Sequence, residues 1–577
     1  MAHLITDSKT FAAQAIAGFA AAHSRYVRPV SGGVVRSTVI PTGQVTLVIG
    51  GGSGHYPSFA GLVGPGLAAG AVCGNIFASP SSGQVHRVCH SVNRQAGTML
   101  VIGNYAGDVL QFGLGAERLR GEGADVRLLA VTDDIASAPP DQIQKRRGIA
   151  GLLAVFKIAG AAAEAGRTLD EVERVARHAN DRVRSLGVAF SGCTLPGAPA
   201  PLFTVMPGRM AVGLGIHGEP GISEVPVPDA PGLADLLVGR LLAEMPTGVD
   251  ARSGRAVVIL NGLGGFKYEE LFTLFGAVHE RLAASGITIA DTECGELVTS
   301  LEMAGVSLTL FWVDDELEAL WKAPADSPAY RRGSIKAEPD TAHARPSSEA
   351  PELASPAAQI DGDTDTATAA LVLKRLRVVK RALSESEQEL GRLDAVAGDG
   401  DHGIGMSRGV AGAVAAAERV VASGGGVKRL LLETGEAWSE QGGGTSGALW
   451  GIALTAAGAS LPAASATDTA TDTASVSRAV DAALTAMQRL GKAQIGDKTM
   501  IDAVAPFAEA LRRSVVEGRN LAGAWSEAAR CATEAAAETA RLLPRIGRAR
   551  PHAEKSRGHP DAGAVSFARI VTAAGND

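Results

Sequence analysis

Five apolar runs rich in β-branched residues constrain the fold of this 577-residue chain more than any other feature. Each run ends in a loop rich in glycine or aspartate. The runs are QVTLVIGGGSG, TMLVIGNYAGD, VRLLAVTDD, RAVVILNGLGG and VSLTLFWVDD. Because Ala-rich helical segments alternate with these runs, we expect parallel strands of an α/β fold. Ligands of such folds bind at the carboxyl ends of the strands, which is where the polar loops fall.

The chain is too long for one hydrophobic core, and its composition changes along its length. We predict an α/β domain over residues 1–325, a flexible linker over 326–366 and an all-α domain over 367–577. The linker segment is rich in Pro, Ala, Ser and Asp and contains almost no large apolar residues. Helical periodicity begins after it, and the rest of the chain is mostly Ala-rich helix.

Charge, hydropathy and cysteine content exclude several classes of protein. The net charge of −7 and the absence of a basic block argue against nucleic-acid binding. No apolar run is as long as a membrane span, and the first ten residues, MAHLITDSKT, lack the apolar core of an export signal. The five cysteines are scattered without a CxxC pair, which suits a reducing compartment. We therefore expect a cytoplasmic protein that binds neither membrane nor nucleic acid.

Two of the strand ends carry candidate site residues. GGGSGHYPS (50–58) has no GK[ST] and cannot be a Walker A loop, but its small residues would let backbone N–H groups approach a ligand. His55 at its end is a candidate acid or base, although the loop could be only a structural turn. In NYAGDVLQF, Asp108 is either a site carboxylate or the N-cap of a helix.

The stretch GLGIHGEPG (213–221) fits the dinucleotide pattern GxGxxG. A dinucleotide loop opens a helix, however, and Pro220 and Gly221 argue against an uninterrupted helix here. The stretch is not HExxH either, so a zinc-protease site is excluded. What remains is His217 on an open glycine-rich turn, where it is either a packed structural histidine or a nucleophile.

The strongest signal in the second half is LDAVAGDGDHGIGMSRG (393–409). Its aspartates, Asp394, Asp399 and Asp401, do not have the spacing of an EF-hand loop. Three carboxylates within eight residues repel one another unless a cation lies between them, and oxygen ligands favour Mg²⁺ or Ca²⁺. The alternative is a solvated acidic turn. In GGGTSGALWG, Thr445 and Ser446 follow a glycine turn that opens a helix, which is typical of an anion site.

Together these motifs resemble dihydroxyacetone kinases of the single-chain, ATP-dependent type. GGGSGH, NYAGD, GIHGEPG, NGLGG and TSLEMAGVSLTL are similar to the ketose-binding K domain of that family. LDAVAGDGDHG, GGTSGALWG, GDKTMIDAV and GRA…DAGA are similar to its nucleotide-binding L domain. The resemblance implies a K domain of two α/β subdomains and an L domain built as a barrel of eight helices. It also implies a homodimer in which the K domain of one chain faces the L domain of the other.

For the K domain, the resemblance implies that His217 attacks the carbonyl of a short-chain ketose and holds it as a covalent hemiaminal. Asp108 and His55 would handle the proton of the hydroxyl that attacks the γ-phosphate of ATP. The residues implied to bind the ketose are Gly52, Ser53, Gly54, His55, Gly103, Asp108 and His217.

For the L domain, the resemblance implies ATP and two Mg²⁺ ions as cofactors, with the ions held by Asp394, Asp399 and Asp401. Arg548 would neutralise charge on the transferring phosphoryl group. The residues implied to line the nucleotide are His402, Gly403, Ile404, Gly405, Thr445, Ser446, Gly491, Met500, Arg548, Asp561, Ala562 and Gly563.

The sequence departs from the family pattern beside the implied ketose pocket. Gly103 stands where the family usually has lysine, and Tyr56 where it usually has glutamate. Losing the lysine should free volume, so we expect a four-carbon substrate, D- or L-erythrulose, ahead of dihydroxyacetone. Two alternatives use the same scaffold: a lyase that releases cyclic FMN from FAD, and a non-catalytic coregulator of transcription. The presence of His217 and the three aspartates favours the kinase.

Overall fold

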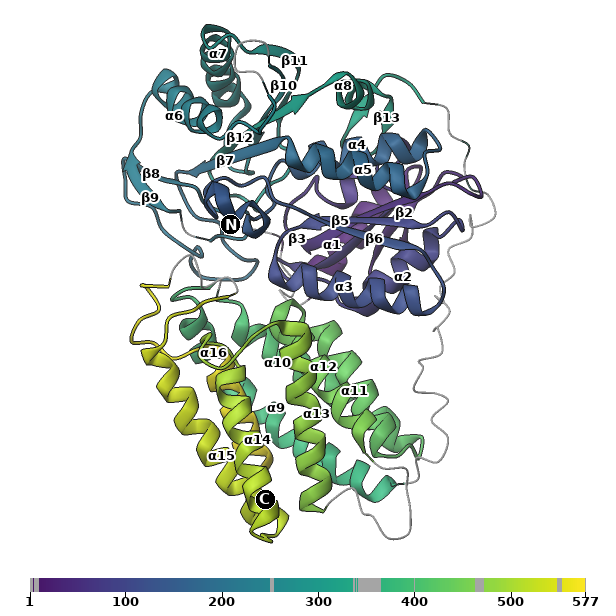
Figure 1. The fold of residues 1–577 in the computed structure, drawn as a ribbon, viewed down its shortest axis with the longest axis vertical. Coiled ribbons are helices and arrows are strands. Elements are labelled where there is room, and N and C mark those ends of the chain that lie inside the picture. The colour runs from purple at the N-terminus through teal and green to yellow at the C-terminus, as the bar shows by residue number, and fades with distance from the viewer. Residues whose placement is uncertain are drawn as a thin grey trace. The chain divides into compact units, whose positions relative to one another are not determined.

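The computed structural model describes residues 4, 10–219, 221–249, 254–335, 338, 340, 365–398, 400–461, 472–546 and 553–575. The chain divides into two compact units, Met1–Ala350 and Pro351–Asp577. The first unit is α/β and the second is helical (Figure 1). The expected fold class is therefore confirmed for both.

The first sheet of the α/β unit has six strands, in the order β1 (Val27–Val30), β2 (Gly33–Arg36), β4 (Gly70–Ile76), β3 (Thr46–Ser53), β5 (Thr98–Gly103) and β6 (Val126–Val131). β4, β3, β5 and β6 run parallel, and β1 and β2 add an antiparallel edge. In this register Val48 of β3 lies beside Leu100 of β5, which lies beside Leu128 of β6. The loops GGGSG and NYAGD consequently leave the same edge of the sheet from adjacent strands.

Helices cover both faces of this sheet. They are α1 (Phe11–Ala22), α2 (Ser82–Val92), α3 (Ala106–Gly121), α4 (Leu152–Glu164) and α5 (Leu169–Asp181). Val48 packs with α2 and α3, whereas its neighbour Ile49 packs with α4 and α5, because successive side chains of a strand point to opposite faces. Capping boxes at Ser81 and Thr168 begin α2 and α5.

The second sheet also has six strands, in the order β11 (Thr288–Gly295), β10 (Arg255–Gly262), β12 (Gly305–Val313), β7 (Val183–Ala189), β8 (Arg209–Val212) and β9 (Ser223–Pro226). Only the β10–β11 pair is parallel among these described strands, so the expectation of parallel strands is wrong for this sheet. The apolar run of β12 reflects burial on both faces rather than strand direction. On one face lie α6 (Ala230–Ala243) and α7 (Tyr268–Ala284). On the other face, Val257 and Phe311 join the core around α4.

The helix α4 is apolar on all sides because both sheets contribute to the core that surrounds it. Its lysine, Lys157, is fully buried and donates a hydrogen bond to the backbone oxygen of Leu320 at 2.8 Å. Leu320 belongs to α8 (Asp315–Lys322), which is followed by a short hairpin of β13 (Ala325–Asp326) and β14 (Arg331–Arg332). The first residues of the expected linker, 326–332, thus belong to a packed hairpin.

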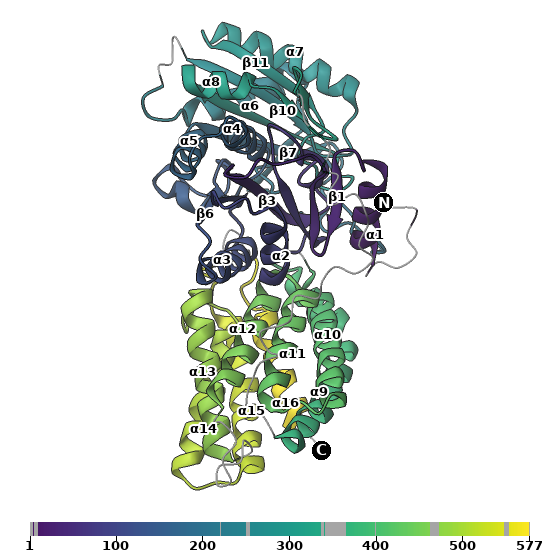
Figure 2. The same cartoon turned by 90° about the vertical axis from the view of Figure 1, so that its right-hand side faces the viewer.

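The helical unit is a closed ring of eight α-helices among the described residues. They are α9 (Thr366–Asp394), α10 (His402–Ala422), α11 (Val427–Gly442), α12 (Gly444–Ser460), α13 (Thr473–Gly491), α14 (Ile501–Val516), α15 (Leu521–Glu538) and α16 (Ala562–Gly575). Each helix packs against the next one in the chain, and α16 packs against α9 (Figure 2). The ring is therefore closed by helices from its two ends, as the eight-helix barrel expected from the resemblance requires.

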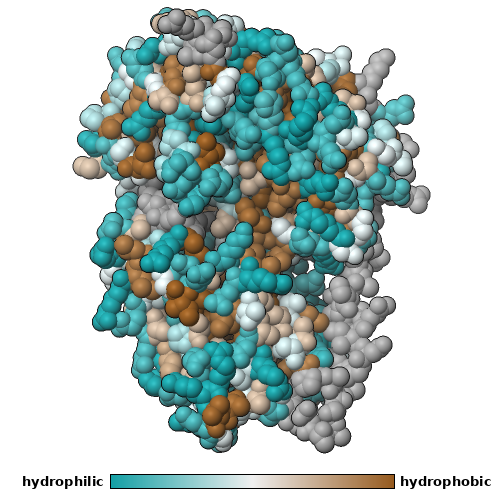
Figure 3. Space-filling model, in the orientation of Figure 1, coloured by the Kyte–Doolittle hydropathy of each residue, from teal (hydrophilic) through white to brown (hydrophobic). Residues whose placement is uncertain are grey.

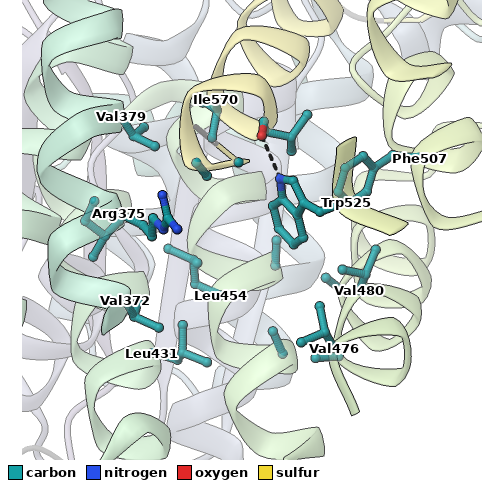
Figure 4. Close-up of a pocket in the computed structure, with 18 of the residues that line it drawn as sticks. Val372, Arg375, Val379, Leu431, Leu454, Val476, Val480, Phe507, Trp525 and Ile570 are labelled. Carbon is teal, nitrogen blue, oxygen red and sulfur yellow. Dashed lines mark hydrogen bonds between the residues drawn. The ribbon is translucent and has the colours of Figure 1, made fainter. Parts of the chain in front are cut away.

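A cavity of about 620 Å³ runs between the helices of this ring. Its lining is almost entirely apolar, and Arg375 of α9 is the one charged side chain among the described residues that line it (Figure 4). Trp525 of α15 links two helices of the cavity wall, because its indole N–H donates to the backbone oxygen of Val571 in α16 at 2.7 Å. The cavity extends from the ends of the helices at Thr368 and Gly575 to the tryptophans Trp438 and Trp450.

No helix among the described residues combines the length and the hydropathy that crossing a membrane requires. On the face drawn in Figure 3, hydrophilic side chains cover most of the surface, and hydrophobic ones are interspersed.

Candidate active site

The glycine-rich end of β3 and the loop after it lie too close to neighbouring residues for any side chain. A Cβ atom on Gly52 would lie 2.8 Å from the backbone nitrogen of Ala78, and Gly54 has a φ of +106°. The loop delivers His55, which is buried and has Nδ1 2.8 Å from the backbone oxygen of Thr299. Because a carbonyl oxygen only accepts, Nδ1 carries the proton and Nε2 is the basic nitrogen of neutral His55.

The second strand end places Asp108 in the first turn of α3. Tyr105 occupies the N-cap position, so the alternative of Asp108 as the N-cap is wrong. The Asp108 side chain is buried, and its Oδ2 lies 3.8 Å from the point where a Cβ on Gly51 would stand. The carboxylate therefore faces the glycine loop of the adjacent strand.

His217 lies on the turn between β8 and β9, so the element that follows it directly is a strand and not a helix. This excludes a dinucleotide loop; Pro220, which argued against one, lies outside the described residues. His217 is only 3% exposed, and its ring is surrounded by edge-to-face rings. The ring centroids of Tyr105, His55 and Phe77 lie 4.3, 4.6 and 5.5 Å away. The structure thus brings His55 and His217 into direct contact.

Gly103 does not open the volume that its small size suggests. A Cβ at this position would lie 3.0 Å from the ring of Tyr105, which covers it. Tyr56 is half exposed, and its ring packs against Phe19 of α1 with the centroids 5.8 Å apart. The expectation of freed space at Gly103 is therefore wrong, because Tyr105 fills that space.

Three polar residues near His217 were not predicted from the sequence: Glu219, Arg147 and Asp134. Glu219 lies within the GIHGEPG motif, and its Oε1 is 3.5 Å from Nδ1 of His217. Asp134 ends the run VRLLAVTDD, so its position after a strand was a usable signal. Nothing in the sequence relates Arg147 to either of them.

The aspartates of the helical unit converge from distant parts of the chain. Asp394 is the last residue of α9, its Oδ2 accepts the Gly400 N–H at 2.9 Å, and Asp401 directly precedes α10. Burial, together with the charge of Asp394, raises the pKa of Asp401 to about 7. Burial likewise raises the pKa of Asp561 to about 7, with Asp394 adding to the shift. Asp399 lies outside the described residues.

These partly buried carboxylates repel one another and fit a divalent cation such as Mg²⁺. Within the part of the chain that the structure describes, no three acidic, histidine or cysteine side chains are arranged closely enough to hold an ion by themselves. An ion at this site would therefore also need ligands from the nucleotide or from Asp399.

Three helix N-termini meet beside the aspartates. His402, the first residue of α10, has Nε2 2.9 Å from the hydroxyl of Ser566 in α16 and Nδ1 3.2 Å from that of Ser446 in α12. Ser566 donates its own hydrogen to the Gly563 oxygen, so it accepts from Nε2 of His402. Burial lowers the pKa of His402, which keeps the ring neutral. Converging N-termini carry the partial positive charge that favours phosphate groups.

The remaining residues implied to line the nucleotide lie around these N-termini. Thr445 is in the first turn of α12, Met500 precedes α14, and a Cβ on Gly563 would lie 3.4 Å from Cβ of Met500. Gly403 instead serves packing, since a Cβ there would lie 1.9 Å from the backbone oxygen of Glu387 in α9. Ile404 and Gly405 follow in α10, Gly491 ends α13, and Ala562 begins α16. Arg548 lies outside the described residues.

Comparison with known proteins covers both units. A Dak1 domain is recognised over residues 17–329 and a DAK2 domain over 396–576. The chain is 52% identical to the L-erythrulose kinase of Pectobacterium atrosepticum, over 99% of this chain and 96% of that one. It is 51% identical to the D-erythrulose kinase of Mycolicibacterium smegmatis, over 98% of this chain and 97% of that one. The solved dihydroxyacetone kinase of C. freundii, in complex with AMP-PNP and Mg²⁺, is 30% identical over 99% of both chains, with a TM-score of 0.53.

Proposed function

Because the chain belongs to the dihydroxyacetone kinase family, with a Dak1 and a DAK2 domain in one polypeptide, we propose that it is an ATP-dependent kinase of erythrulose. The relatives described above, at 51–52% identity over nearly the whole chain, are kinases of L- and D-erythrulose. Dihydroxyacetone is the next substrate we expect. The cofactors of the proposal are ATP and Mg²⁺, which the solved C. freundii enzyme holds as AMP-PNP and Mg²⁺.

The observation that carries the proposal is the buried pair of imidazoles at the end of the first sheet. His217 and His55 lie edge to face at 4.6 Å, and His55 directly follows the glycine-rich stretch GGGSG. The Nδ1 atom of His217 faces Glu219, so Nε2 faces away from it and is the nucleophilic nitrogen of the proposal. Capture of the ketose carbonyl by this nitrogen would orient the substrate and select against polyols, which lack a carbonyl.

Asp108 and His55 would then act on the proton of the terminal hydroxyl. Both side chains are buried at the ends of adjacent parallel strands; Asp108 faces Gly51, and His55 directly follows Gly54. A base at this position would make the hydroxyl oxygen a better nucleophile toward the γ-phosphate. The ketose would be held by Gly52, Ser53, Gly54 and Gly103 in addition to the three reactive side chains.

In the helical unit, Asp394, Asp399 and Asp401 would hold two Mg²⁺ ions, which supply positive charge to the nucleotide phosphates. The N-termini of α10, α12 and α16 would bind the same phosphates through backbone N–H groups. His402, fixed by Ser446 and Ser566, would keep these N-termini in place.

Substrate preference and the covalent step are tested together. We would measure kcat/KM for L-erythrulose, D-erythrulose and dihydroxyacetone with ATP, in the wild type and in His217→Ala. The expected result is a preference for an erythrulose isomer, with activity lost in the variant. A clear preference for dihydroxyacetone would overturn the erythrulose assignment, and full activity of His217→Ala would overturn the covalent step. Incubation with FAD, followed by detection of cyclic FMN, tests the alternative that the protein is a lyase.

We also propose that the protein works as a homodimer in the cytoplasm, with the K domain of one chain serving the L domain of its partner. The five free cysteines suit a reducing compartment. Mixing two inactive variants, His217→Ala and Asp401→Ala, tests the arrangement, because a mixed dimer would contain one intact pair of domains. Recovery of activity after subunit exchange is the expected result. No recovery in a mixture shown to contain mixed dimers would contradict it.

A further inference from the structure

Glu219 points its carboxylate back at the imidazole two residues before it. One oxygen, Oε1, lies 3.5 Å from Nδ1 of His217, and the other, Oε2, accepts the backbone N–H of the same residue at 2.9 Å. Both side chains are buried, with exposed fractions of 7% and 3%. The carboxylate therefore accepts a hydrogen bond from the backbone of His217 and lies beside Nδ1 of its ring.

A second pair of charges lies behind this carboxylate. The guanidinium of Arg147 pairs with Asp134 at 2.8 Å and donates to the backbone oxygen of Gly213 at 3.0 Å. Burial alone would lower the pKa of Arg147, but the charges of Asp134 and Glu219 beside it hold that pKa above its ordinary value. Arg147 thus places a positive charge beside the buried carboxylate of Glu219.

Gly215 leaves the room for this arrangement. A Cβ at that position would lie 2.2 Å from Oε2 of Glu219 and 2.8 Å from Nη1 of Arg147. The carboxylate and the guanidinium therefore both lie where a side chain of residue 215 would stand. The backbone conformation of Gly215 is ordinary, so the requirement for glycine here is one of space.

We propose that Glu219 is a positioning residue for His217, held in place by Arg147 and Asp134. Its carboxylate fixes the imidazole through Nδ1–H, so that Nε2 faces the ketose carbonyl. This inference rests on the proposed function, because it concerns the same histidine. It adds three residues to which no role had been given.

The proposed arrangement assists the covalent step in a defined way. The Nε2 lone pair forms the new bond to the carbonyl carbon, and the π pair of the carbonyl moves to its oxygen, which takes up a proton. The imidazole would then carry a positive charge, which is relieved as the Nδ1 proton shifts toward Glu219. The proton on the former carbonyl oxygen comes from solvent, so the hemiaminal is neutral and the proton count balances when Glu219 holds the Nδ1 proton. Breakdown of the hemiaminal after phosphoryl transfer reverses these shifts.

The test compares Glu219→Gln, Glu219→Asp and Glu244→Gln. Glu244 is the matched control, since it pairs at 2.7 Å with Arg146, whose side chain is fully buried. The amide of Glu219→Gln places an N–H donor near Nδ1 and favours the wrong tautomer, so we expect kcat/KM for erythrulose to fall at least about 100-fold. Native mass spectrometry should show loss of the ketose adduct in this variant, partial recovery in Glu219→Asp and no loss in Glu244→Gln.

A readout that a purely structural glutamate would not move is the tautomer of His217. The ¹⁵N spectrum of histidine-labelled wild type should show His217 protonated at Nδ1, and Glu219→Gln should shift the proton toward Nε2. If Glu219→Gln does not fold, Gly215→Ala replaces it, because its methyl group displaces the same carboxylate. The wild-type spectrum needs no variant at all.

The inference is overturned if Glu219→Gln keeps the adduct and kcat/KM within about threefold of wild type, if Glu244→Gln loses as much, or if wild-type His217 is protonated at Nε2. Failure of the proposed function looks different. In that case the wild type itself would phosphorylate no ketose and form no adduct, whatever the tautomer of His217.

Discussion

Asn261, at the end of β10, supports the candidate site from a distance, and replacing it should loosen the loop that holds His55. Its Nδ2 donates to the Val298 oxygen at 2.8 Å and to the Ser307 hydroxyl at 3.0 Å. Its Oδ1 accepts the N–H groups of Leu297 and Val298, both at 2.9 Å. The amide is fully buried and uses its whole hydrogen-bonding capacity. Thr299, which follows Val298 in the chain, accepts the hydrogen bond of His55 through its backbone oxygen.

The size of the effect follows from the groups left behind. Asn261→Ala leaves two N–H groups and one carbonyl oxygen of residues 297–298 without this partner. Each buried unsatisfied group costs about 1–3 kcal/mol, and neighbouring losses add up incompletely. We therefore expect a loss of about 3–5 kcal/mol in the free energy of unfolding. Ser307→Ala removes a single acceptor and should cost about 1 kcal/mol.

Hydrogen exchange measured on peptides that span residues 296–301 reports this change locally. A loss of 3 kcal/mol corresponds to a rise of roughly 100-fold in the exchange rate of the Leu297 and Val298 amides. Denaturant unfolding of wild type, Asn261→Ala and Ser307→Ala gives the global value. The reasoning fails if the two variants exchange at the same rate in this segment and unfold within 1 kcal/mol of each other.

Three further outcomes follow from the structure. Gly276→Ala should raise the free energy of unfolding by about 0.5–1 kcal/mol, because a Cβ at this exposed position of α7 meets nothing within 4 Å. Gly160→Ala should lower it, because its Cβ would lie 2.6 Å from Leu67. Chemical denaturation measures both. Burial lowers the pKa of Lys157 from 10.5 to about 7, so the unfolded state binds the proton more tightly than the folded state does. The free energy of unfolding of the wild type, relative to that of Lys157→Met, should therefore rise by up to about 1.4 kcal/mol per pH unit between pH 7 and 10. Parallel pH profiles of stability for the two proteins would contradict this. Removing Mg²⁺ with EDTA should abolish phosphoryl transfer but leave the ketose adduct on His217, as native mass spectrometry can show, since the adduct involves only residues of the α/β unit.

The sequence was sufficient to predict the strands and the change from α/β to helical structure, because both depend on local patterns of apolar and polar residues. It was not sufficient to predict the direction of β12. An apolar run reports that both faces of a strand are covered, and α4 and α7 cover the second sheet just as they would cover a parallel one. The short strands β8 and β9 gave no signal, since β9 is largely exposed and polar.

The site shows the same limit. His217 stood out because its motif is specific, but the part that Arg147 plays depends on contacts across 72 positions of sequence that only the fold creates. Likewise Asp561 meets Asp394 only when α16 returns to α9. The prediction of free volume at Gly103 was wrong for a related reason. The volume beside a glycine depends on its neighbours in the fold, and here the neighbour is Tyr105.

The contact between α9 and α16 also has a consequence for synthesis on the ribosome. Chains emerge from their N-terminus, so the α/β unit is complete while most of the helical ring is still unmade. Until α16 is synthesised, the gap between α9 and α15 is open, and the apolar lining between Val372 and Phe507 faces water. A ribosome that stalls before residue 562 would thus release a complete α/β unit joined to an incomplete helical ring with an exposed apolar lining, which is a substrate for chaperones.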